Sequence, residues 1–242
     1  MTGPVRQALA EFRASPAADG WCQLPFFTEG VADALAARVD ERIAAGAQVL
    51  PPPQDMFTGL RLAPLERVKV VILGQDPYPT PGHSHGLAFS YRGPGRLPAS
   101  LRVILDELAA DLGIPKPGSG DLSPWARQGV LCLNTALTVE AGRAGAHLKF
   151  GWSALADEAM AAVSAQRPAA VFLLWGGPAR QRAILVDREK PLVIESGHPS
   201  PLNRLNDFRG TRPFSRANAW LTEKGLEPID WRLPGCEPHS AA

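Results

Sequence analysis

The stretch at residues 67–78, RVKVVILGQDPY, decides the fold. Its first part, residues 67–73, is close to unbroken in hydrophobicity, rich in β-branched side chains and too short for a helix. Such a run is typical of a strand that is buried on both faces, as strands of parallel sheets are. Polar residues follow at once in Gln75 and Asp76, so the chain is expected to leave the sheet there.

Three further runs of the same kind lie at residues 129–133, 169–175 and 191–195. Helical periodicity is found between them at 101–112, 152–166, 179–186 and 214–224, and before the first strand at 29–45. Ser100 is a candidate N-cap for the helix at 101–112. Strands that alternate with helices predict a single-domain three-layer α/β/α fold with a central, mostly parallel four-stranded sheet. We expect one domain over residues 1–242, with a motif-bearing core at about 50–232 and a short frayed tail after Pro234.

Composition limits the classes of function. The chain has 242 residues, is 45% hydrophobic and carries a formal charge of +1, which excludes a disordered chain and a broadly basic surface. Its three cysteines form no CxxC pair, so a disulfide framework and a four-cysteine iron–sulfur site are excluded. The longest apolar run is too short to span a bilayer. Residues 1–14 lack an apolar secretory core, so we expect a cytoplasmic protein without membrane contact.

Polar residues follow each predicted strand. Gln75 and Asp76 follow the first, Asn134 the second, two glycines at 176–177 the third and His198 the fourth. In an open parallel sheet, ligands bind outside the carboxyl ends of the strands. The spacing therefore predicts that the amides, the carboxylate and the imidazole converge on one site.

Each of these residues also has a purely structural interpretation. Asp76 could close an Asx turn, Asn134 could cap a turn, and His198 could be a structural hydrogen-bonding residue. Tyr78 and Phe89 could be core aromatics. The functional interpretation is a carboxylate that orients a water, two amides that read the edge of a heterocycle, and aromatic walls for a flat ring.

The histidine, glycine and arginine patterns give little support to other classes of function, such as metal-binding or nucleotide-cofactor-binding proteins. The pair at His83 and His85 has no carboxylate or thiol nearby, so we expect no metal. The glycines at 74, 82 and 86 match no phosphate-binding fingerprint, so we expect no nucleotide cofactor. Four arginines between residues 198 and 218 face one acid, Asp207. This local surplus is either a solvated surface or a phosphate-facing patch.

Five ordered motifs make the chain recognisable: GQDPY at 74–78, GLAFS at 86–90, LNT followed by LTVEAG at 133–142, LLWG at 173–176 and HPSPL at 198–202. This set resembles the family-1 uracil-DNA glycosylases, and the similarity runs from about residue 51 to 231. The resemblance implies a monofunctional DNA glycosylase that hydrolyses the N-glycosidic bond of deoxyuridine in DNA. It would release uracil, leave an abasic site and need no cofactor.

The resemblance also implies residue roles. Asp76 would orient the attacking water and stabilise the cationic sugar, and His198 would donate, as a neutral imidazole, to the departing uracil. The uracil-binding residues would be Gln75, Tyr78, Phe89 and Asn134, with Tyr78 blocking a C5 methyl. The DNA-contacting residues would be Pro98, Ser100, Gly176, Ser200, Leu202 and Asn203. Expected partners are uracil-containing DNA and, as in related proteins, a protein inhibitor; we expect a monomer.

Four positions depart from the family pattern. Pro79 replaces a usual His, Gly177 and Asn203 replace serines expected to contact phosphate, and Ala99 replaces a proline. The changes at Gly177 and Asn203 remove hydroxyls and bear on DNA affinity rather than on the chemistry. Two alternatives stay open at this point: a catalytically silent module that binds uracil or single-stranded DNA, and a small-molecule binder. Because Asp76 and His198 are both present, the sequence favours the enzyme.

Overall fold

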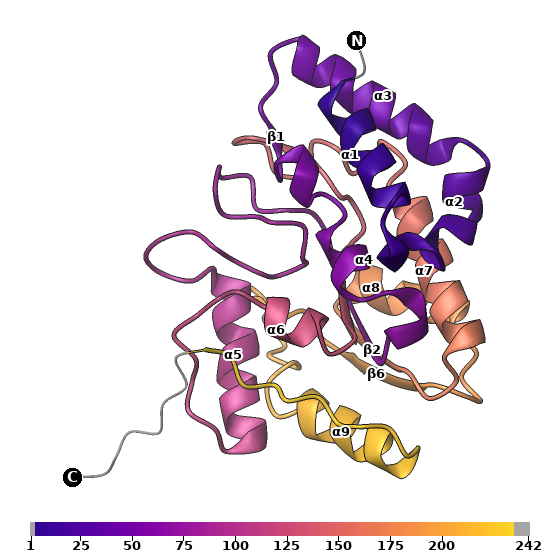
Figure 1. Cartoon of the computed structure of the whole chain (residues 1–242). Helices are drawn as coiled ribbons and strands as arrows, with labels where there is room; N and C mark the ends of the chain where they lie inside the picture. The colour runs from indigo at the N-terminus through magenta and orange to yellow at the C-terminus, as the bar shows by residue number, and fades with distance from the viewer. Residues whose placement is uncertain (1–2, 235–242) are drawn as a thin grey trace.

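Four parallel strands form the centre of the computed structural model, which describes residues 3–234 of the chain (Figure 1). In spatial order they are β3 (Val130–Asn134), β2 (Val70–Gly74), β5 (Val171–Trp175) and β6 (Leu192–Ser196). The register pairs Gly74 with Asn134 and Trp175 with Ser196, so the carboxyl ends of the strands lie together. The predicted four-stranded parallel sheet is confirmed. The tail after Pro234 lies outside the described residues.

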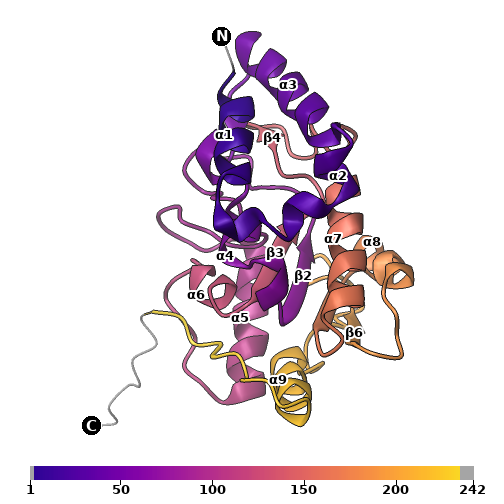
Figure 2. The same cartoon turned by 45° about the vertical axis from the view of Figure 1, so that its right-hand side comes forward.

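Both faces of the sheet are covered by helices, because successive side chains of each strand point to opposite faces and both sets are apolar. Val71, Leu73 and Phe172 pack into one core cluster, whereas Val70, Ile72 and Leu173 pack into the other. Figures 1 and 2 show the two helical layers. The first contains α1 (Pro4–Arg13), α2 (Pro25–Thr28), α3 (Val31–Ala44), α4 (Thr58–Leu62), α7 (Ser153–Gln166) and α8 (Gly177–Gln181); the second contains α5 (Ala99–Leu112), α6 (Ser123–Ala126) and α9 (Pro213–Glu223). The three-layer prediction is confirmed.

A second, two-stranded sheet was not predicted. β1 (Val49–Leu50) pairs antiparallel with β4 (Val139–Glu140), which lies about ninety residues further along the chain. Two-residue strands carry no periodicity that a sequence pattern could reveal, and their pairing depends on distant segments meeting. Short 3₁₀ helices complete the chain at Pro16–Ala18, Trp21–Gln23, Pro53–Asp55, Leu65–Arg67 and Arg182–Leu185.

Two local predictions need correction. Ser100 is not the N-cap of α5, because the helix begins at Ala99 and the extended residue Pro98 occupies the cap position. Ser100 therefore lies in the first turn, where its hydroxyl is not needed for capping. The helix expected at 179–186 divides into α8 and a 3₁₀ turn. Over residues 3–234, no helix combines the length and apolarity needed to cross a membrane.

Candidate active site

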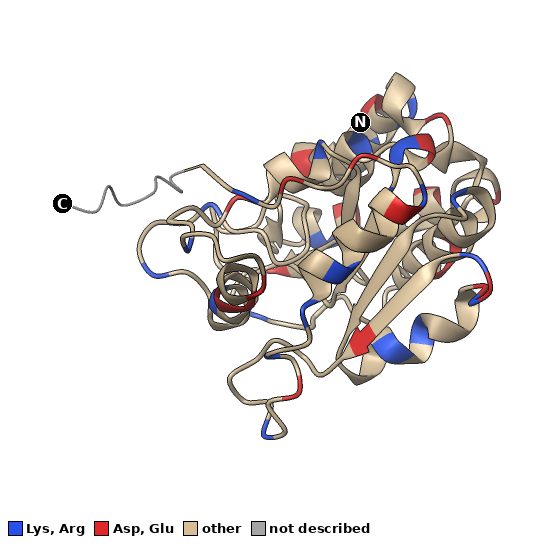
Figure 3. Ribbon diagram, turned by 90° about the horizontal axis from the view of Figure 1, so that it is seen from below, with Lys and Arg blue, Asp and Glu red and all other residues tan. Residues whose placement is uncertain are grey.

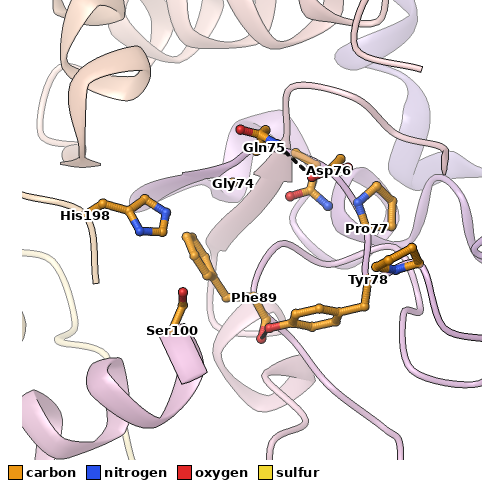
Figure 4. A pocket seen from close by; sticks show the side chains of 10 residues that line it. Gly74, Gln75, Asp76, Pro77, Tyr78, Phe89, Ser100 and His198 are labelled. Carbon is orange, nitrogen blue, oxygen red and sulfur yellow. Dashed lines mark hydrogen bonds between the residues drawn. The ribbon is translucent and has the colours of Figure 1, made fainter. Parts of the chain in front are cut away.

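A pocket of about 250 Å³ opens at the carboxyl ends of β2 and β3 (Figure 4). The close-up shows His198 entering from one side and Gln75 and Asp76 from the other, with the Phe89 ring between them. Six residues singled out from the sequence line this pocket together, and Ser100 joins them. The full lining is Gly74, Gln75, Asp76, Pro77, Tyr78, Pro79, Phe89, Ser100, Asn134 and His198.

The Asp76 carboxylate is held in place by its neighbours. Its Oδ2 accepts a hydrogen bond of 2.6 Å from the backbone N–H of Gly145, and its Oδ1 accepts one of 3.1 Å from the side chain of Gln75. The Gln75 backbone carbonyl in turn accepts bonds from Ala136 and from the Thr135 hydroxyl. The loop after β2 is thereby tied to the loop after β3. Gly145 was missed in the sequence, where nothing marks a backbone donor that lies 69 residues away.

His198 follows β6 and meets the pocket beside Gly176. The φ of Gly176 is +86°, and a Cβ at this position would lie 3.0 Å from the His198 Cβ, so glycine permits the close approach of the two loops. Partial burial of the imidazole lowers the pKa of His198 from its ordinary value of 6.5. A neutral imidazole is thus favoured near pH 7, and it can donate one hydrogen bond.

Phe89 and Tyr78 form an aromatic wall. Phe89 has a φ of +62°, a conformation that is rare for a bulky residue and that marks functional sites when the surroundings enforce it. The Tyr78 hydroxyl donates a 3.0 Å hydrogen bond to the Phe89 carbonyl and so helps to hold it. The Phe89 ring lies 6.1 Å from the His198 ring and 5.7 Å from Trp175, centroid to centroid. Burial raises the pKa of the Tyr78 phenol, so the hydroxyl stays protonated.

Asn134 ends β3 with only 7% of its surface exposed. Within residues 3–234, its side-chain amide has no hydrogen-bond partner, so its donor and its acceptor both stay available to a ligand in the pocket. The residue as a whole is buried, but its amide atoms are accessible from the pocket, where water or a ligand can satisfy them. The amide lies directly against Gly74 of the neighbouring strand.

The predicted DNA-contacting residues divide into two places. Pro98 and Ser100 lie at the start of α5, on one side of the pocket. Gly176, Ser200, Leu202 and Asn203 line a second hollow on the other side of His198. Leu202 is 87% exposed there, and Leu205, which lines the same hollow, is 81% exposed.

Carboxylates on α5 reduce the local positive surplus of the arginines between residues 198 and 218. Arg209 lies 3.5 Å from Asp106, and Arg212 lies 3.2 Å from Asp111, both on α5. Two of the four positive charges are therefore neutralised by carboxylates. Figure 3 shows acidic and basic positions interspersed over the ribbon rather than gathered on one face.

No metal centre is built by the described part of the chain. Over residues 3–234, no group of three or more His, Cys, Asp or Glu side chains could hold a metal ion. His85 Nε2 lies 2.6 Å from the Ser90 hydroxyl, and His83 packs edge-on against Tyr91 at 4.8 Å. Burial lowers the pKa of His85 to about 4, so this histidine is a neutral structural residue.

Comparison with known proteins identifies relatives over most of the chain. Residues 61–222 match the model of the uracil DNA glycosylase superfamily. Curated proteins named uracil-DNA glycosylase are 52% identical over 193 residues (Rhizobium meliloti; 80% of each chain) and 49% identical over 214 residues (Sinorhizobium medicae; 88% of this chain and 89% of the relative).

Solved structures share the fold. The mimivirus uracil-DNA glycosylase superposes with a TM-score of 0.82 at 24% identity, covering 93% of this chain and 89% of that one. A variant of mimivirus UNG in complex with UGI superposes with a TM-score of 0.86, also at 24% identity, covering 93% and 91%.

Proposed function

The chain belongs to the uracil DNA glycosylase superfamily and excises uracil from DNA, and from this premise we propose that it is a monofunctional family-1 enzyme. The observation that carries the proposal is the convergence of Asp76, Asn134 and His198 on one pocket. The pocket thus offers the three interactions that release of an anionic base requires. The imidazole can donate to the departing base, the unpaired amide can bind its edge, and the carboxylate can stabilise the cationic sugar.

The pocket would bind an extruded uracil through its edge and its face. The Asn134 amide can accept from N3–H and donate to O4 of uracil, whereas cytosine presents the reverse pattern. Phe89 would stack on the ring, and Tyr78 would occupy the space that a C5 methyl needs. A site built on specific hydrogen bonds can reject a mismatched analogue by roughly 10⁴-fold. Gln75 would complete the contacts to the base.

Cleavage would divide the charge of the transition state between two residues. The C1′–N1 bond breaks, its electron pair leaves with uracil, and the sugar gains oxocarbenium character. His198 would donate to the carbonyl oxygen where negative charge develops, a contribution typically of about 3 kcal/mol. Asp76 would stabilise the cationic sugar and orient the water that adds to C1′. The proton that this water loses balances the one that the uracil anion takes up. The fixed hydrogen bonds of Asp76 would keep the carboxylate in place. Neither step calls for a metal or an organic cofactor.

Access to the base requires that the nucleotide leave the duplex. Flipping costs a few kcal/mol of unstacking and unpairing. The exposed Leu202 would fill the vacated space. Pro98, Ser100, Gly176, Ser200 and Asn203 lie on the two sides of the pocket where the flanking backbone would pass.

Lyase chemistry is not part of the proposal. It needs an amine nucleophile that forms a Schiff base with the sugar. No lysine occurs in the GQDPY, GLAFS, LNT, LLWG or HPSPL segments, and none lines the pocket. The product is therefore an abasic site in an intact strand.

We extend the proposal to organisation and partners. The motif-bearing core, about 50–232, works as part of one domain, and the protein acts as a monomer in the cytoplasm. Single- or double-stranded DNA that contains uracil is the substrate. The fold is shared with a mimivirus UNG variant solved in complex with UGI, which supports a protein inhibitor of that type as a further partner.

The test is an oligonucleotide that carries one deoxyuridine. We expect free uracil and an alkali-labile site, with the strand intact before alkali and with no change on addition of chelator. His198→Ala and Asp76→Asn should each reduce the rate by about 10²-fold or more while DNA binding persists. Binding without any uracil release by the unsubstituted protein would favour the silent binding module instead.

A further inference from the structure

A second hollow, of about 400 Å³, lies beside the active-site pocket and shares His198 with it. One wall is α8, and the other is the loop that carries Leu202. Its lining is Gly176, Gly177, Arg180, Gly197, His198, Ser200, Leu202, Asn203, Leu205 and Asp207. Since this hollow adjoins the pocket that would hold the flipped nucleotide, it is where that strand would continue.

Most polar side chains of the hollow are already engaged within the loop. Asn203 Nδ2 donates to the His198 carbonyl at 3.1 Å and to Asp207 Oδ1 at 2.8 Å, and Asn203 Oδ1 accepts from the Leu205 N–H at 3.3 Å. The Ser200 hydroxyl oxygen accepts from the Leu202 N–H at 3.2 Å. The loop is therefore held together by its own side chains. Asn203 would influence DNA binding by stabilising this loop, because its amide is already hydrogen-bonded within it.

Asp207 makes the electrostatic balance of the hollow unfavourable for DNA unless a cation is present. Its carboxylate lines the same space, and it lies so close to Gly197 that a Cβ there would come within 1.6 Å of Oδ1. A backbone phosphate in this hollow would meet a like charge. The phosphate needs a compensating positive side chain, because cationic contacts supply much of the affinity for nucleic acid.

Arg180 is the side chain that meets this need. It is exposed and lines the hollow, and within residues 3–234 its guanidinium has no carboxylate or other hydrogen-bond partner. Gly177 lies three residues earlier on α8, on the same face of the helix, and its missing side chain leaves open space there. The Cα–Cβ bonds of a helix tilt toward its N-terminus, so the Arg180 side chain can reach the open space at Gly177.

Four neighbouring arginines do not combine an unpaired guanidinium with a place in the hollow. Arg182, two residues further along, donates from Nε to Asp157 at 2.6 Å and from Nη1 to the Pro178 carbonyl. Arg209 and Arg212 are paired with carboxylates of α5. Arg204 lies on the loop but does not line the hollow.

We propose that Arg180 binds a backbone phosphate of the strand whose uracil nucleotide enters the pocket, in the hollow between α8 and the Leu202 loop. This inference rests on the proposed function and adds a residue to its DNA contacts. The guanidinium offers paired N–H donors to the phosphate oxygens and offsets the charge of Asp207.

The salt dependence of DNA binding tests the proposal. Affinity for an oligonucleotide with an uncleavable tetrahydrofuran abasic analogue is measured for the unsubstituted protein, Arg180→Ala, Arg180→Lys and Arg182→Ala, from 50 to 200 mM salt. One lost phosphate contact lowers the slope of log K against log salt by about 0.9 on duplex DNA. Over a fourfold rise in salt, the unsubstituted protein should lose about 3.5-fold more affinity than Arg180→Ala.

Arg180→Lys, which keeps the charge, should restore the slope, and Arg182→Ala should leave it unchanged, because Arg182 is already paired. Thermal unfolding of each variant confirms that it is folded. An unchanged slope in folded Arg180→Ala, or an equal fall in Arg182→Ala, would overturn the assignment. Failure of the unsubstituted protein to release uracil would instead reject the proposed function, so the two failures are distinguishable.

Discussion

The substitution Gly74→Ala tests whether the sheet positions the Asn134 amide, which we propose reads the edge of the base. A Cβ on Gly74 would lie 2.2 Å from Oδ1 of Asn134 and 2.8 Å from the Cβ of Ala88, where ordinary contacts begin at 3.4 Å. Ala88 is fully buried, so the Asn134 amide is the group that can move, and it must retreat by roughly 1 Å. A misplacement of about 1 Å in a catalytic site can cost about 10²-fold in rate. We therefore expect kcat/KM for uracil release to fall by about 10²-fold, or about 2.7 kcal/mol of transition-state stabilisation.

The assay is uracil release from an oligonucleotide with a single deoxyuridine, measured beside thermal unfolding. Overpacking at a strand end costs about 1–3 kcal/mol, so the variant should unfold at a lower temperature but remain folded at 25 °C. Gly118→Ala is the matched control, because a Cβ there meets nothing within 4 Å. If Gly74→Ala folds and retains the kcat/KM of the unsubstituted protein, the register of β2 and β3 does not position the base-reading amide.

Four further outcomes are expected. Tyr78→Ala should release thymine from DNA at a measurable rate; uracil release without any thymine release would remove the methyl-blocking role. Asn134→Asp should gain cytosine release, because a protonated carboxyl can both donate and accept at the cytosine edge; an unchanged base preference would contradict edge reading. In the His198→Ala background, Asn134→Asp should still change base preference, since the two residues act on different parts of the base; loss of that change would show that they act as one unit. Glu140→Gln should lower Tm at pH 7, because Arg42 and its neighbours lower the pKa of Glu140 from 4.5 to about 2. The ionised carboxylate stabilises the fold fully above pH 4.5, so the difference in Tm between the two proteins should shrink as the pH falls toward about 2. A difference in Tm that stays constant with pH would show that the charge of Glu140 is not its cause.

The central sheet could be predicted because its signal is local. Apolar, β-branched runs such as residues 70–73 are buried on both faces in this fold, so hydrophobicity alone marks them. Once the strands are parallel, chain topology places the residues after them at one edge. The prediction that Asp76, Asn134 and His198 line one pocket follows from that geometry, and the structure brings the three together.

Other features depended on contacts between distant segments. The bond from Gly145 to Asp76 joins residues 69 apart, and the pairing of β1 with β4 joins segments without any periodic pattern. Ser100 has the composition of an N-cap, yet the preceding Pro98 takes the cap position, and Ser100 lies at the pocket instead. Local propensity is a weak guide where tertiary packing chooses between two roles for one residue.

The pairing of charged side chains also depended on contacts between distant segments. From the sequence, Arg209 and Arg212 belong to a local positive surplus, because the carboxylates that neutralise them lie about 100 residues earlier, on α5. Arg180 stands out only when its neighbours are known, since a free guanidinium is defined by which carboxylates lie out of its reach. The amino-acid sequence alone determined the three layers, the common edge at which the parallel strands end, and the residue types at that edge. Which side chains are paired and which are left unpaired was decided by the tertiary structure, because hydrogen bonds and ion pairs act over a few ångströms in space, whatever the separation along the chain.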